Sequence, residues 1–520
     1  MSKSIGIDLG TTTTIVSYTN KKGHLSQLRY EGETLIPSVL YFKTKQDYIV
    51  GKKAKKAMRM NPAAGIANFK RRMGDRTDVY EVTAENGDTF RISGEAAAEK
   101  FLDKLIEKMN GKIEDEYPDD PSATIENVVI TVPAKFNSVE VDATKRAAHD
   151  CALDDVHVAA EPTAAAVAVI QENEQNVHDG MTVLVYDFGG GTFDVSVIQQ
   201  QNGAFQEIAT NGDKNLGGND LTERIVDRLR ENIEDQYGVE LPEDPDDVDD
   251  NVMSYADYQQ NMQSIRDMAN SMKEELSSET EASDQTMLYF KDGMKPFEVT
   301  LRRKEFENFI REDIKRTIDI TMRTIDEARK AGIETIDQVV LAGGSSAIPL
   351  IQEELEKRLE NVNPGEDASY LISAGASMLA EHVENLETMT TAISNAQLGV
   401  EVYPRRFQAL IPENVALPYS GSHTFRLARD GQQKLQVPCW EYDVKNHPGA
   451  QRVDEEGMEQ IDTILISDLP PNLKKAETQV KVTFTEQLDG SLKLEAELVD
   501  MDGKTIRSGV KAKSKASNVE

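Results

Sequence analysis

The chain has few of the residues that hold small or metal-dependent proteins together. Its 520 residues include only two cysteines, Cys151 and Cys439, and seven histidines that show no paired spacing. Disulfide scaffolds and zinc sites need several such residues at short, regular intervals. We therefore expect no zinc site, and we interpret each cysteine as a small buried apolar residue. A chain of this length can bury two or three domain cores without disulfides or metal.

The sequence also lacks a long apolar run and an excess of positive charge. The start, MSKSIGID, leads straight into a strand pattern without the apolar core of a signal peptide, and no run approaches the length of a membrane span. The 58 basic and 91 acidic side chains give a formal net charge of −33, which argues against general binding to nucleic acid or to an anionic membrane. We expect a cytoplasmic monomer with no nucleic-acid or membrane partner.

Two short segments share one pattern, in which a strand-like run delivers an aspartate to a turn rich in glycine and threonine, and a second strand-like run follows. Glycines let backbone N–H groups approach an anion and threonine hydroxyls add donors, while a carboxylate at the strand end suits the partly hydrated Mg²⁺ that accompanies ATP. Two unrelated tight hairpins are the plainer interpretation. The repetition favours two hairpins that hold a polyphosphate from both sides. The candidate residues are Asp8, Gly10, Thr11 and Thr12 in IGIDLGTTTT, and Asp187, Gly189, Gly190, Gly191, Thr192 and Asp194 in VYDFGGGTFDVSVI.

A third glycine turn occurs in VVLAGGSSAIPLIQEEL, from Val339 to Leu355. A strand-like run reaches Gly343 and Gly344, and the apolar spacing then changes to that of a helix. A strand, a diglycine turn and a helix N-terminus form a seat for an anion or for the nucleoside end of a nucleotide. We therefore add Gly343, Gly344 and Ser345 to the candidate site.

The composition changes along the chain and indicates two domains. Strands and amphipathic helices alternate over residues 1–385, which is typical of an α/β domain. Residues 386–396, LETMTTAISNA, are small and polar, as expected of a linker. Residues 397–510 contain short β-rich segments and a hairpin signal, Asp489-Gly490, so we predict an all-β sandwich. Residues 511–520 are predicted to be a disordered tail.

The chain resembles the seventy-kilodalton heat-shock chaperones of the DnaK type over nearly its whole length. The resemblance implies an actin-like ATPase domain, with two lobes and four subdomains around a cleft, followed by a β-sandwich that grips extended apolar peptides. It also implies ATP, ADP and Mg²⁺ as cofactors, with K⁺ as a further candidate ion. The motifs that carry it are IGIDLGTT, NFKRRMG, AAEPTAAAVA, VYDFGGGTFDVSVI, ATNGDKNLGGNDL, MKEELSS, LAGGSSAIPLIQE, IPENVALP and DGSLKLEAELVDMDGK.

The resemblance assigns roles to individual residues of this sequence. Lys70 would reach the γ-phosphate, and Asp194 would orient the attacking water. Asp8, Asp187 and Glu161 would hold Mg²⁺, mostly through water. Without the family pattern, Lys70 would be one more member of a basic stretch and Glu161 an ordinary carboxylate at a helix start. Threonines 11, 12 and 192 would meet the β- and γ-phosphates, and the further cofactor-binding positions are Gly217, Gly218, Lys273 and Ser277.

Four residues of the first domain depart from the family pattern. Ala347 stands where an arginine stacks on the adenine base, and Asn270 replaces a glutamate that faces the ribose, so we expect weaker ATP binding than is typical of the family. Lys135 and Val141 replace a tyrosine and an arginine that relay the signal between the domains. The linker also lacks the usual aliphatic and acidic run, so we expect either that other residues carry the signal between the domains or that interdomain coupling is weak.

The sandwich departs from the family pattern as well. The loop that usually arches over the peptide reads Tyr403-Pro404-Arg405, and the central peptide pocket falls on Leu435. The sequence has no match to the helical lid that closes over bound peptide in the family. Tyr403 and Leu435 are the candidate peptide-binding residues.

These features support three functional hypotheses. The leading one is an ATP-dependent chaperone whose lidless sandwich binds unfolded or extended polypeptide reversibly, with a J-domain co-chaperone and a nucleotide exchange factor as further partners. The second is an ATP-switched regulatory module that docks one defined protein partner, favoured by the altered sandwich loop. The third, a small-molecule kinase on the same scaffold, is disfavoured by the sandwich.

Overall fold

The protein is represented by a computed structural model that falls into two compact units, residues 1–135 with 144–386 and residues 136–143 with 387–520. The predicted linker lies partly outside the described residues. The structure describes residues 4–75, 79–120, 124–149, 151, 156–172, 179–202, 204–363, 368–383, 390–394, 396–413, 415–427, 429–444, 447–466, 469–507 and 512–514.

Two sheets of the first unit repeat one strand arrangement. The strands of the first sheet are β1 (Ser4–Leu9), β2 (Thr13–Thr19), β3 (Leu25–Gln27), β4 (Ile36–Pro37), β10 (Asn127–Val132) and β11 (Val156–Ala160). Those of the second are β12 (Thr182–Phe188), β13 (Phe193–Gln201), β14 (Ala204–Asp213), β17 (Gln338–Ala342) and β18 (Val362–Asn363). In each sheet a central strand, β1 or β12, forms an antiparallel hairpin on one side and a parallel pair on the other. The two glycine turns therefore occupy equivalent places.

Two helices, α4 (Glu161–Glu172) and α10 (Ala368–Ala380), lie between the two sheets and share one core with both. Residues 161–170 of α4, EPTAAAVAVI, are buried on every side, as expected of a helix covered on both faces. The two helices cross closely at Gly375, where an ideal Cβ would lie 1.8 Å from Ala164 O. This contact requires glycine. Because the two helices share their core with both sheets, the sheets and helices form one actin-like α/β domain, as the sequence predicts.

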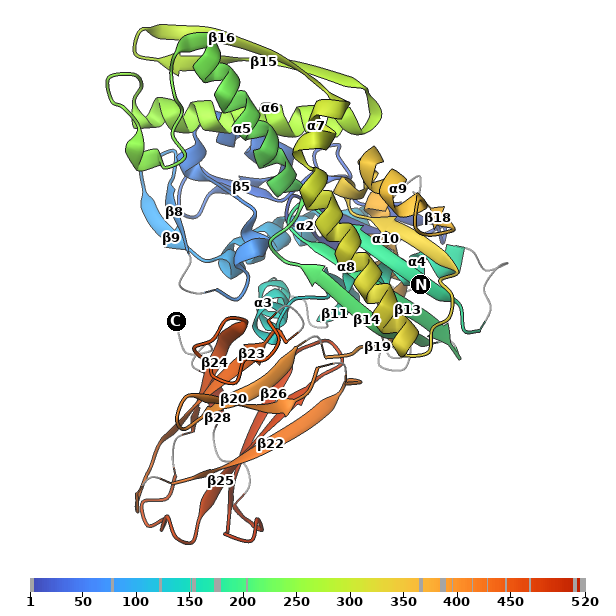
Figure 1. Ribbon diagram of the computed structural model, residues 1–520, viewed down its shortest axis with the longest axis vertical. Coiled ribbons are helices and arrows are strands. Elements are labelled where there is room, and N and C mark those ends of the chain that lie inside the picture. Colours follow the sequence, from blue (N-terminus) through green and yellow to red (C-terminus); the bar gives the residue numbers. More distant parts are fainter. Residues whose placement is uncertain are drawn as a thin grey trace. The chain divides into compact units, whose positions relative to one another are not determined.

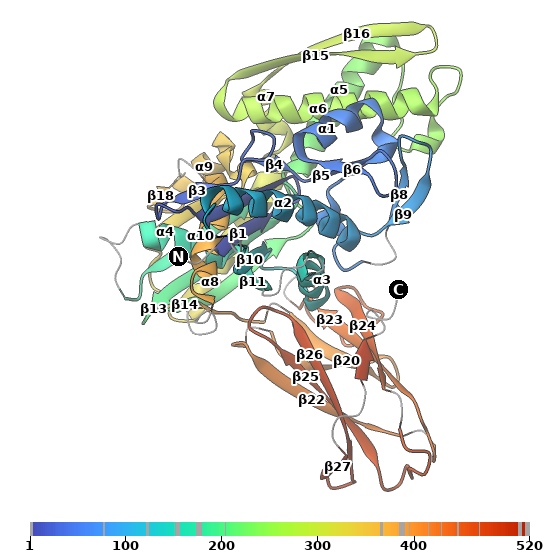
Figure 2. The ribbon, with the colours of Figure 1, turned by 180° about the vertical axis from the view of Figure 1, so that it is seen from behind.

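Further helices and small sheets extend from each of these sheets (Figures 1 and 2). On the side of the first sheet they are β5 (Val39–Phe42), β6 (Tyr48–Val50), α1 (Gly51–Met60), η1 (Pro62–Ala64), β7 (Gly65–Ala67), η2 (Phe69–Arg72), β8 (Tyr80–Thr83), β9 (Thr89–Ile92) and α2 (Gly94–Glu116). On the side of the second they are α5 (Gly218–Tyr237), η3 (Pro245–Asp247), α6 (Tyr255–Ser278), β15 (Glu281–Phe290), β16 (Gly293–Arg302), α7 (Arg303–Phe309), α8 (Arg311–Lys330), η4 (Gly344–Ala347) and α9 (Pro349–Glu356). One more helix, α3 (Ser138–His149), contains residues of both units.

The second unit is the predicted β-sandwich. One sheet has the order β21-β20-β23-β24-β28 and the other β22-β25-β26-β27. In β25, alternate residues from Val480 to Glu486 are buried, which is the period of a strand that covers a core with one face. The strands of these two sheets are β20 (Gln397–Val402), β21 (Arg406–Ile411), β22 (Tyr419–Arg426), β23 (Leu435–Tyr442), β24 (Met458–Ile466), β25 (Gln479–Glu486), β26 (Leu492–Val499), β27 (Thr505–Arg507) and β28 (Ala512–Ser514). The short strand β19 (Thr390–Thr391) belongs to neither of them.

Strand β28 corrects one prediction. It pairs antiparallel with β24, whereas we predicted a disordered tail over 511–520. Backbone pairing at a sheet edge needs no apolar side chains, so the polar composition of this segment gave no sign of it. The other residues of the predicted tail lie outside the described residues.

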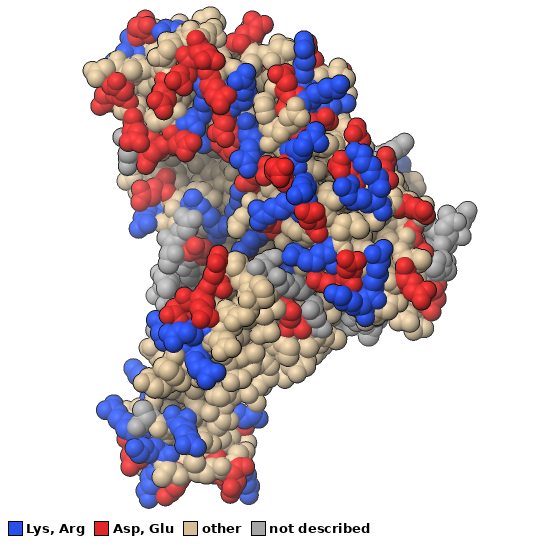
Figure 3. Space-filling view, in the orientation of Figure 1, with Lys and Arg blue, Asp and Glu red and all other residues tan. Residues whose placement is uncertain are grey.

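On the face of the first unit that Figure 3 shows, acidic and basic side chains are distributed unevenly. Figure 3 shows acidic side chains gathered at the end of this unit where β15, β16 and α5 lie, while basic and acidic side chains intermingle over α8. Within the described part of the chain, no helix combines the length and the apolar character needed to cross a membrane.

Candidate functional site

The two predicted glycine turns face each other in the first unit. An ideal Cβ on Gly190 would lie 2.1 Å from Thr12 Oγ1, and one on Gly191 would lie 2.4 Å from Thr11 Oγ1. Only glycine permits this approach of the two turns. Each turn closes on itself, since Gly10 N donates to Asp8 O and Gly189 N donates to Thr192 O, both over 3.1 Å. The structure thus brings together the hairpin tips that the sequence predicted as a phosphate site.

Three carboxylates converge on these tips. Asp187 and Asp194 are direct cross-strand partners in the β12–β13 hairpin and are both buried, while Asp8 at the end of β1 is partly buried. Burial, reinforced by the negative charge of Glu161, raises the pKa of Asp8 to about 7 and that of Asp194 to about 7. The same two causes raise the pKa of Asp187 well above its ordinary value. A cluster of this kind favours a cation among its members.

One cation of the chain already lies beside them. Lys70 in η2 and Glu161 at the start of α4 are only 4% and 5% exposed, and Lys70 Nζ lies 2.5 Å from Glu161 Oε1. Buried charges are tolerated when they are paired in this way. The structure therefore joins the two residues whose roles rested on the family resemblance alone.

The acids suit a hydrated Mg²⁺ better than a bare ion. Among the described residues, no group of three or more His, Cys, Asp or Glu is arranged to hold a metal ion directly. Asp194 Oδ1 is buried and has no hydrogen-bond partner within the described part of the chain. Mg²⁺ commonly keeps several of its waters and contacts one or two carboxylates. Carboxylate oxygens with an unused acceptor fit that preference.

Several of the further predicted cofactor-binding residues form a second cluster beside the phosphate turns. An ideal Cβ on Gly218 would lie 2.2 Å from Ser345 Oγ and 3.3 Å from Lys273 Nζ. Lys273 Nζ donates to Gly218 O over 2.9 Å and to Thr222 Oγ1 over 2.8 Å, and burial lowers the pKa of Lys273 to about 8. One turn along α6, the hydroxyl of Ser277 donates to Lys273 O over 3.4 Å.

The third glycine turn differs slightly from its prediction. Gly343 has a positive φ of 75°, which favours glycine, and an ideal Cβ there would lie 2.6 Å from Asp187 Oδ1. Gly344 faces open space. The segment then forms the 3-10 turn η4 before α9 begins at Pro349. Proline favours the first position of a helix, which explains the later start.

The residues that depart from the family pattern lie close to this site or in neighbouring helices. Ala347 is exposed on η4, and Asn270 Nδ2 donates to Glu274 Oε1 over 2.7 Å. The positive charge of Lys135 acts on Asp194, where it opposes the rise in pKa that burial causes. Val141 is buried in α3.

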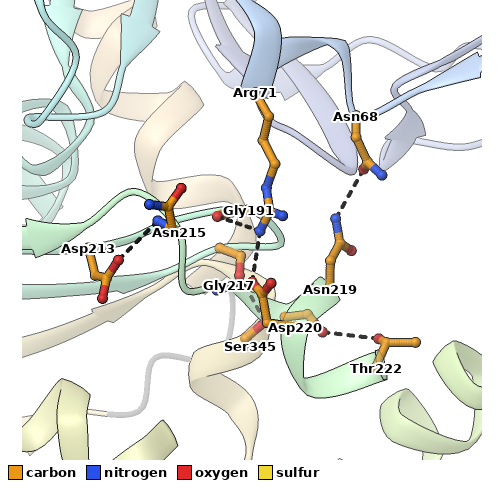
Figure 4. Close-up of polar contacts among 12 residues, drawn as sticks. Asn68, Arg71, Gly191, Asp213, Asn215, Gly217, Asn219, Asp220, Thr222 and Ser345 are labelled. Carbon is orange, nitrogen blue, oxygen red and sulfur yellow. Dashed lines mark hydrogen bonds and ion pairs between the residues drawn. The ribbon is translucent and has the colours of Figure 1, made fainter. Parts of the chain in front are cut away.

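The sequence predictions missed four residues around the second glycine turn (Figure 4). Arg71 Nη2 donates to Gly191 O over 2.7 Å and to Asp220 Oδ2 over 2.8 Å. Asn219 Nδ2 donates to Asn68 Oδ1 over 3.0 Å. One signal was available, because Asp220 follows Gly217 at the spacing of a capping box. Arg71, next to Lys70, carried no signal of its own.

In the sandwich, the two predicted peptide-binding residues have different surroundings. Tyr403 is 97% exposed in the turn of the β20–β21 hairpin, and the Tyr403-Pro404 peptide bond is cis. Leu435 begins β23 and packs partly against the sandwich core.

Comparisons with known proteins agree with this architecture. The model of the family described as "Hsp70 protein" matches residues 4–520. A relative named "Chaperone protein DnaK" from Thermosipho melanesiensis is 30% identical over 505 residues, covering 95% of this chain and 77% of the relative. A relative of the same name from Halobacterium salinarum is 30% identical over 502 residues, covering 95% of this chain and 73% of the relative.

Proposed function

The chain belongs to the Hsp70 family of ATPases, and from that premise we propose that it couples ATP hydrolysis in the first unit to reversible binding of extended polypeptide by the sandwich. The observation that supports hydrolysis most directly is the buried Lys70–Glu161 pair, with 2.5 Å between Nζ and Oε1, beside three carboxylates at the tips of two facing hairpins. Phosphoryl transfer depends mainly on positioning and charge neutralisation, and this group of residues offers both.

Each residue has a role that its position makes reasonable. Lys70 turns from Glu161 to the γ-phosphate and neutralises charge there. Asp194, whose Oδ1 is buried without a hydrogen-bond partner among the described residues, accepts a hydrogen bond from the attacking water and orients it. Asp8, Asp187 and Glu161 would hold Mg²⁺, mostly through water, and the bound ion would supply further charge neutralisation at the phosphates.

The remaining candidates divide between the phosphates and the nucleoside. We assign the threonine hydroxyls and the glycine N–H groups of both turns to the β- and γ-phosphates. We assign the cluster of Gly218, Lys273 and Ser345 to the nucleoside side, because it lies directly beside the second turn. K⁺ is proposed as a further ion, which a comparison of hydrolysis in K⁺ and Na⁺ buffers tests.

Two substitutions test the hydrolytic assignment. Lys70→Ala and Asp194→Asn should each lower the rate of Mg²⁺-dependent hydrolysis by about 10²–10³, since each removes a charged contact to the transition state. ATP should still bind, as calorimetry would measure. Lys56→Ala, on the exposed side of α1, is the control for loss of a nearby positive charge. Hydrolysis within a few-fold of wild type in both variants would remove the two residues from the catalytic set.

For the sandwich, we propose that an extended apolar peptide lies beneath the exposed Tyr403 and against Leu435. Main-chain hydrogen bonds and one apolar side chain would hold it, and such a small contact implies fast release. Fluorescence anisotropy of a labelled apolar peptide with the full chain should show weak, saturable binding. Leu435→Asp should abolish it by placing an unpaired charge in the pocket, whereas Lys475→Ala, on an exposed turn, should not.

The Tyr403-Pro404-Arg405 loop favours one alternative, a module that docks a single folded protein. Absence of saturable binding to every member of a diverse peptide panel, together with capture of a folded partner, would favour docking over general chaperone activity. We further propose that a J-domain co-chaperone and a nucleotide exchange factor act on this chain. Faster ATP hydrolysis on addition of a J-domain protein would support the first partner, and faster ADP release on addition of an exchange factor would support the second.

A further inference from the structure

We propose that Arg71 is a positioning residue that orients the second phosphate turn and, through the same contacts, fixes the segment that carries Lys70. The proposal rests on the nucleotide site proposed above. In Figure 4 the side chains of Arg71 and Asn68 extend from η2 and the residue before it toward the glycine turn and the start of α5. They therefore reach from the side of the first sheet to the side of the second.

The orientation of the turn follows from its carbonyl groups. In a trans peptide, the C=O of one residue and the N–H of the next point in opposite directions. Gly189 O accepts from Gly218 N over 2.9 Å and from Ser345 Oγ over 3.0 Å. Gly190 O accepts from Asn219 N over 2.8 Å. These carbonyls are thus turned toward the start of α5, and the N–H groups that follow them are directed away from it.

Arg71 completes this pattern at the third carbonyl. Its Nη2 donates to Gly191 O over 2.7 Å and also to Asp220 in the first turn of α5. The Gly191 carbonyl is therefore turned toward the start of α5 like the other two, and the N–H of Thr192 is directed away from it like those of Gly190 and Gly191. Three successive N–H groups pointing in one direction form a seat for an anion. Groups of α5 and η4, on the side of the second sheet, donate to the first two carbonyls, whereas a side chain of η2, on the side of the first sheet, donates to the third.

The guanidinium is itself anchored. Asp220 Oδ2 accepts from Arg71 Nη2 over 2.8 Å and from Gly217 N over 2.7 Å. Both partners of the ion pair are about one third exposed, at 32% and 33%, so its electrostatic strength is modest. Its geometry is specific, because one guanidinium nitrogen joins the glycine turn to the first turn of α5.

The same contacts bracket Lys70. Asn68, with a left-handed backbone (φ 57°), accepts from Asn219, and Arg71 contacts Gly191 and Asp220. Lys70 lies between these two anchor points and bonds Glu161. Loss of Arg71 should therefore disturb both the N–H groups of the turn and the placement of the Lys70 ammonium. Binding of the polyphosphate and the rate of hydrolysis depend on these groups, whereas binding of the nucleoside does not.

Calorimetry with ATP, ADP and AMP, together with hydrolysis rates at saturating ATP, tests the proposal. Arg71→Ala should weaken ATP and ADP binding roughly ten- to hundred-fold, the usual effect of losing a charged hydrogen bond, and lower the saturated rate. The ratio of ADP to AMP affinity should fall by the same factor, which general loosening of the fold would not cause. Arg71→Lys, which keeps one charged donor, should recover part of both effects.

Two further variants serve as controls. Asp220→Asn removes the anchor and should give the same pattern in weaker form. Arg72→Ala removes an equal charge one residue away, where the guanidinium lies 4.1 Å from the centre of the Tyr80 ring, and should leave the ADP to AMP ratio unchanged. If Arg71→Ala keeps both its ADP affinity and its saturated rate within two-fold of wild type, the proposal is overturned. Failure of the wild-type protein to bind ATP would instead reject the nucleotide site itself.

Discussion

Arg59 in α1 and Asp267 in α6 form an ion pair, with 2.6 Å between Nε and Oδ2. The aspartate is mostly buried and the arginine about half exposed, at 14% and 53%. Helix α1 packs on the small sheet of β5, β6 and β7, while α6 packs on α5 and β15. The pair therefore connects elements of the two halves of the first unit and resists their separation.

We expect Arg59→Ala to speed the release of ADP. A partly exposed pair contributes about 0.2–1 kcal/mol, which corresponds to roughly a 1.5- to 5-fold faster release. Stopped-flow displacement of a fluorescent ADP analogue would measure it. Lys56→Ala, on the same helix, is the matched control for charge. An unchanged rate of ADP release in Arg59→Ala would show that the ion pair does not restrain separation of the two halves of the first unit.

The Lys70–Glu161 pair yields a prediction for stability. Lys70→Met leaves the buried Glu161 without its partner and should lower the free energy of unfolding of the nucleotide-free protein by about 3 kcal/mol. Removing both charges, in Lys70→Met with Glu161→Met, should cost less than the sum of the single changes. Urea unfolding followed by circular dichroism would measure the three variants.

A surface pair provides the comparison for that cycle. In α8, Arg329 Nη1 lies 3.0 Å from Asp326 Oδ1, and the two side chains are 57% and 61% exposed. Arg329→Met should therefore change the free energy of unfolding by less than about 0.5 kcal/mol. Additive effects at Lys70 and Glu161 would contradict a coupled buried pair.

At the predicted nucleoside side, Ala347→Arg should tighten ATP binding about ten-fold by adding a guanidinium that stacks on the base. Ala347 is exposed on η4, so the longer side chain has room without displacing the core. Calorimetry on the wild type and the variant would measure the gain. Ala347→Gln has no planar cation and should give little of it. Unchanged or weaker binding in Ala347→Arg would place the base elsewhere.

Glu486 makes the stability of the sandwich depend on pH. It is 8% exposed at the end of β25. Burial raises its pKa from 4.5 to about 7, and a hydrogen bond that it accepts from Ser394 opposes this rise. The folded state holds this proton more tightly than the unfolded state. The contribution of Glu486 to the stability of the sandwich is therefore complete below about pH 4.5 and is lost as the pH rises through 7.

The loss should reach about 3 kcal/mol between pH 4.5 and 8. Trp440, the one tryptophan of the sequence, lies in β23 and reports unfolding of the sandwich by fluorescence. Urea unfolding at several pH values should show a decline in the wild type that is largely absent in Glu486→Gln. The difference between the two proteins isolates Glu486 from other groups such as His423. Equal pH profiles would disprove the assignment.

Sequence alone determined the elements whose signals are local. The two hairpins could be predicted because a strand that ends in an aspartate, followed by glycines and threonines, encodes both the turn and its donors within a few residues. The sandwich was predictable for the same reason, since alternation and turn residues lie next to each other in the chain. The buried position of Glu486 also follows from its alternation with Val482 and Phe484, although its pKa does not.

Only the tertiary structure decided which of these groups act together. Lys70 and Glu161 are 91 residues apart, and Arg71 reaches Gly191 and Asp220 at separations of 120 and 149 residues. Such contacts depend on how two sheets pack around α4 and α10, which no short segment encodes. Arginine and asparagine are ordinary surface residues in the sequence. Their roles here arise because packing brings η2 close to a glycine turn whose carbonyl groups need donors.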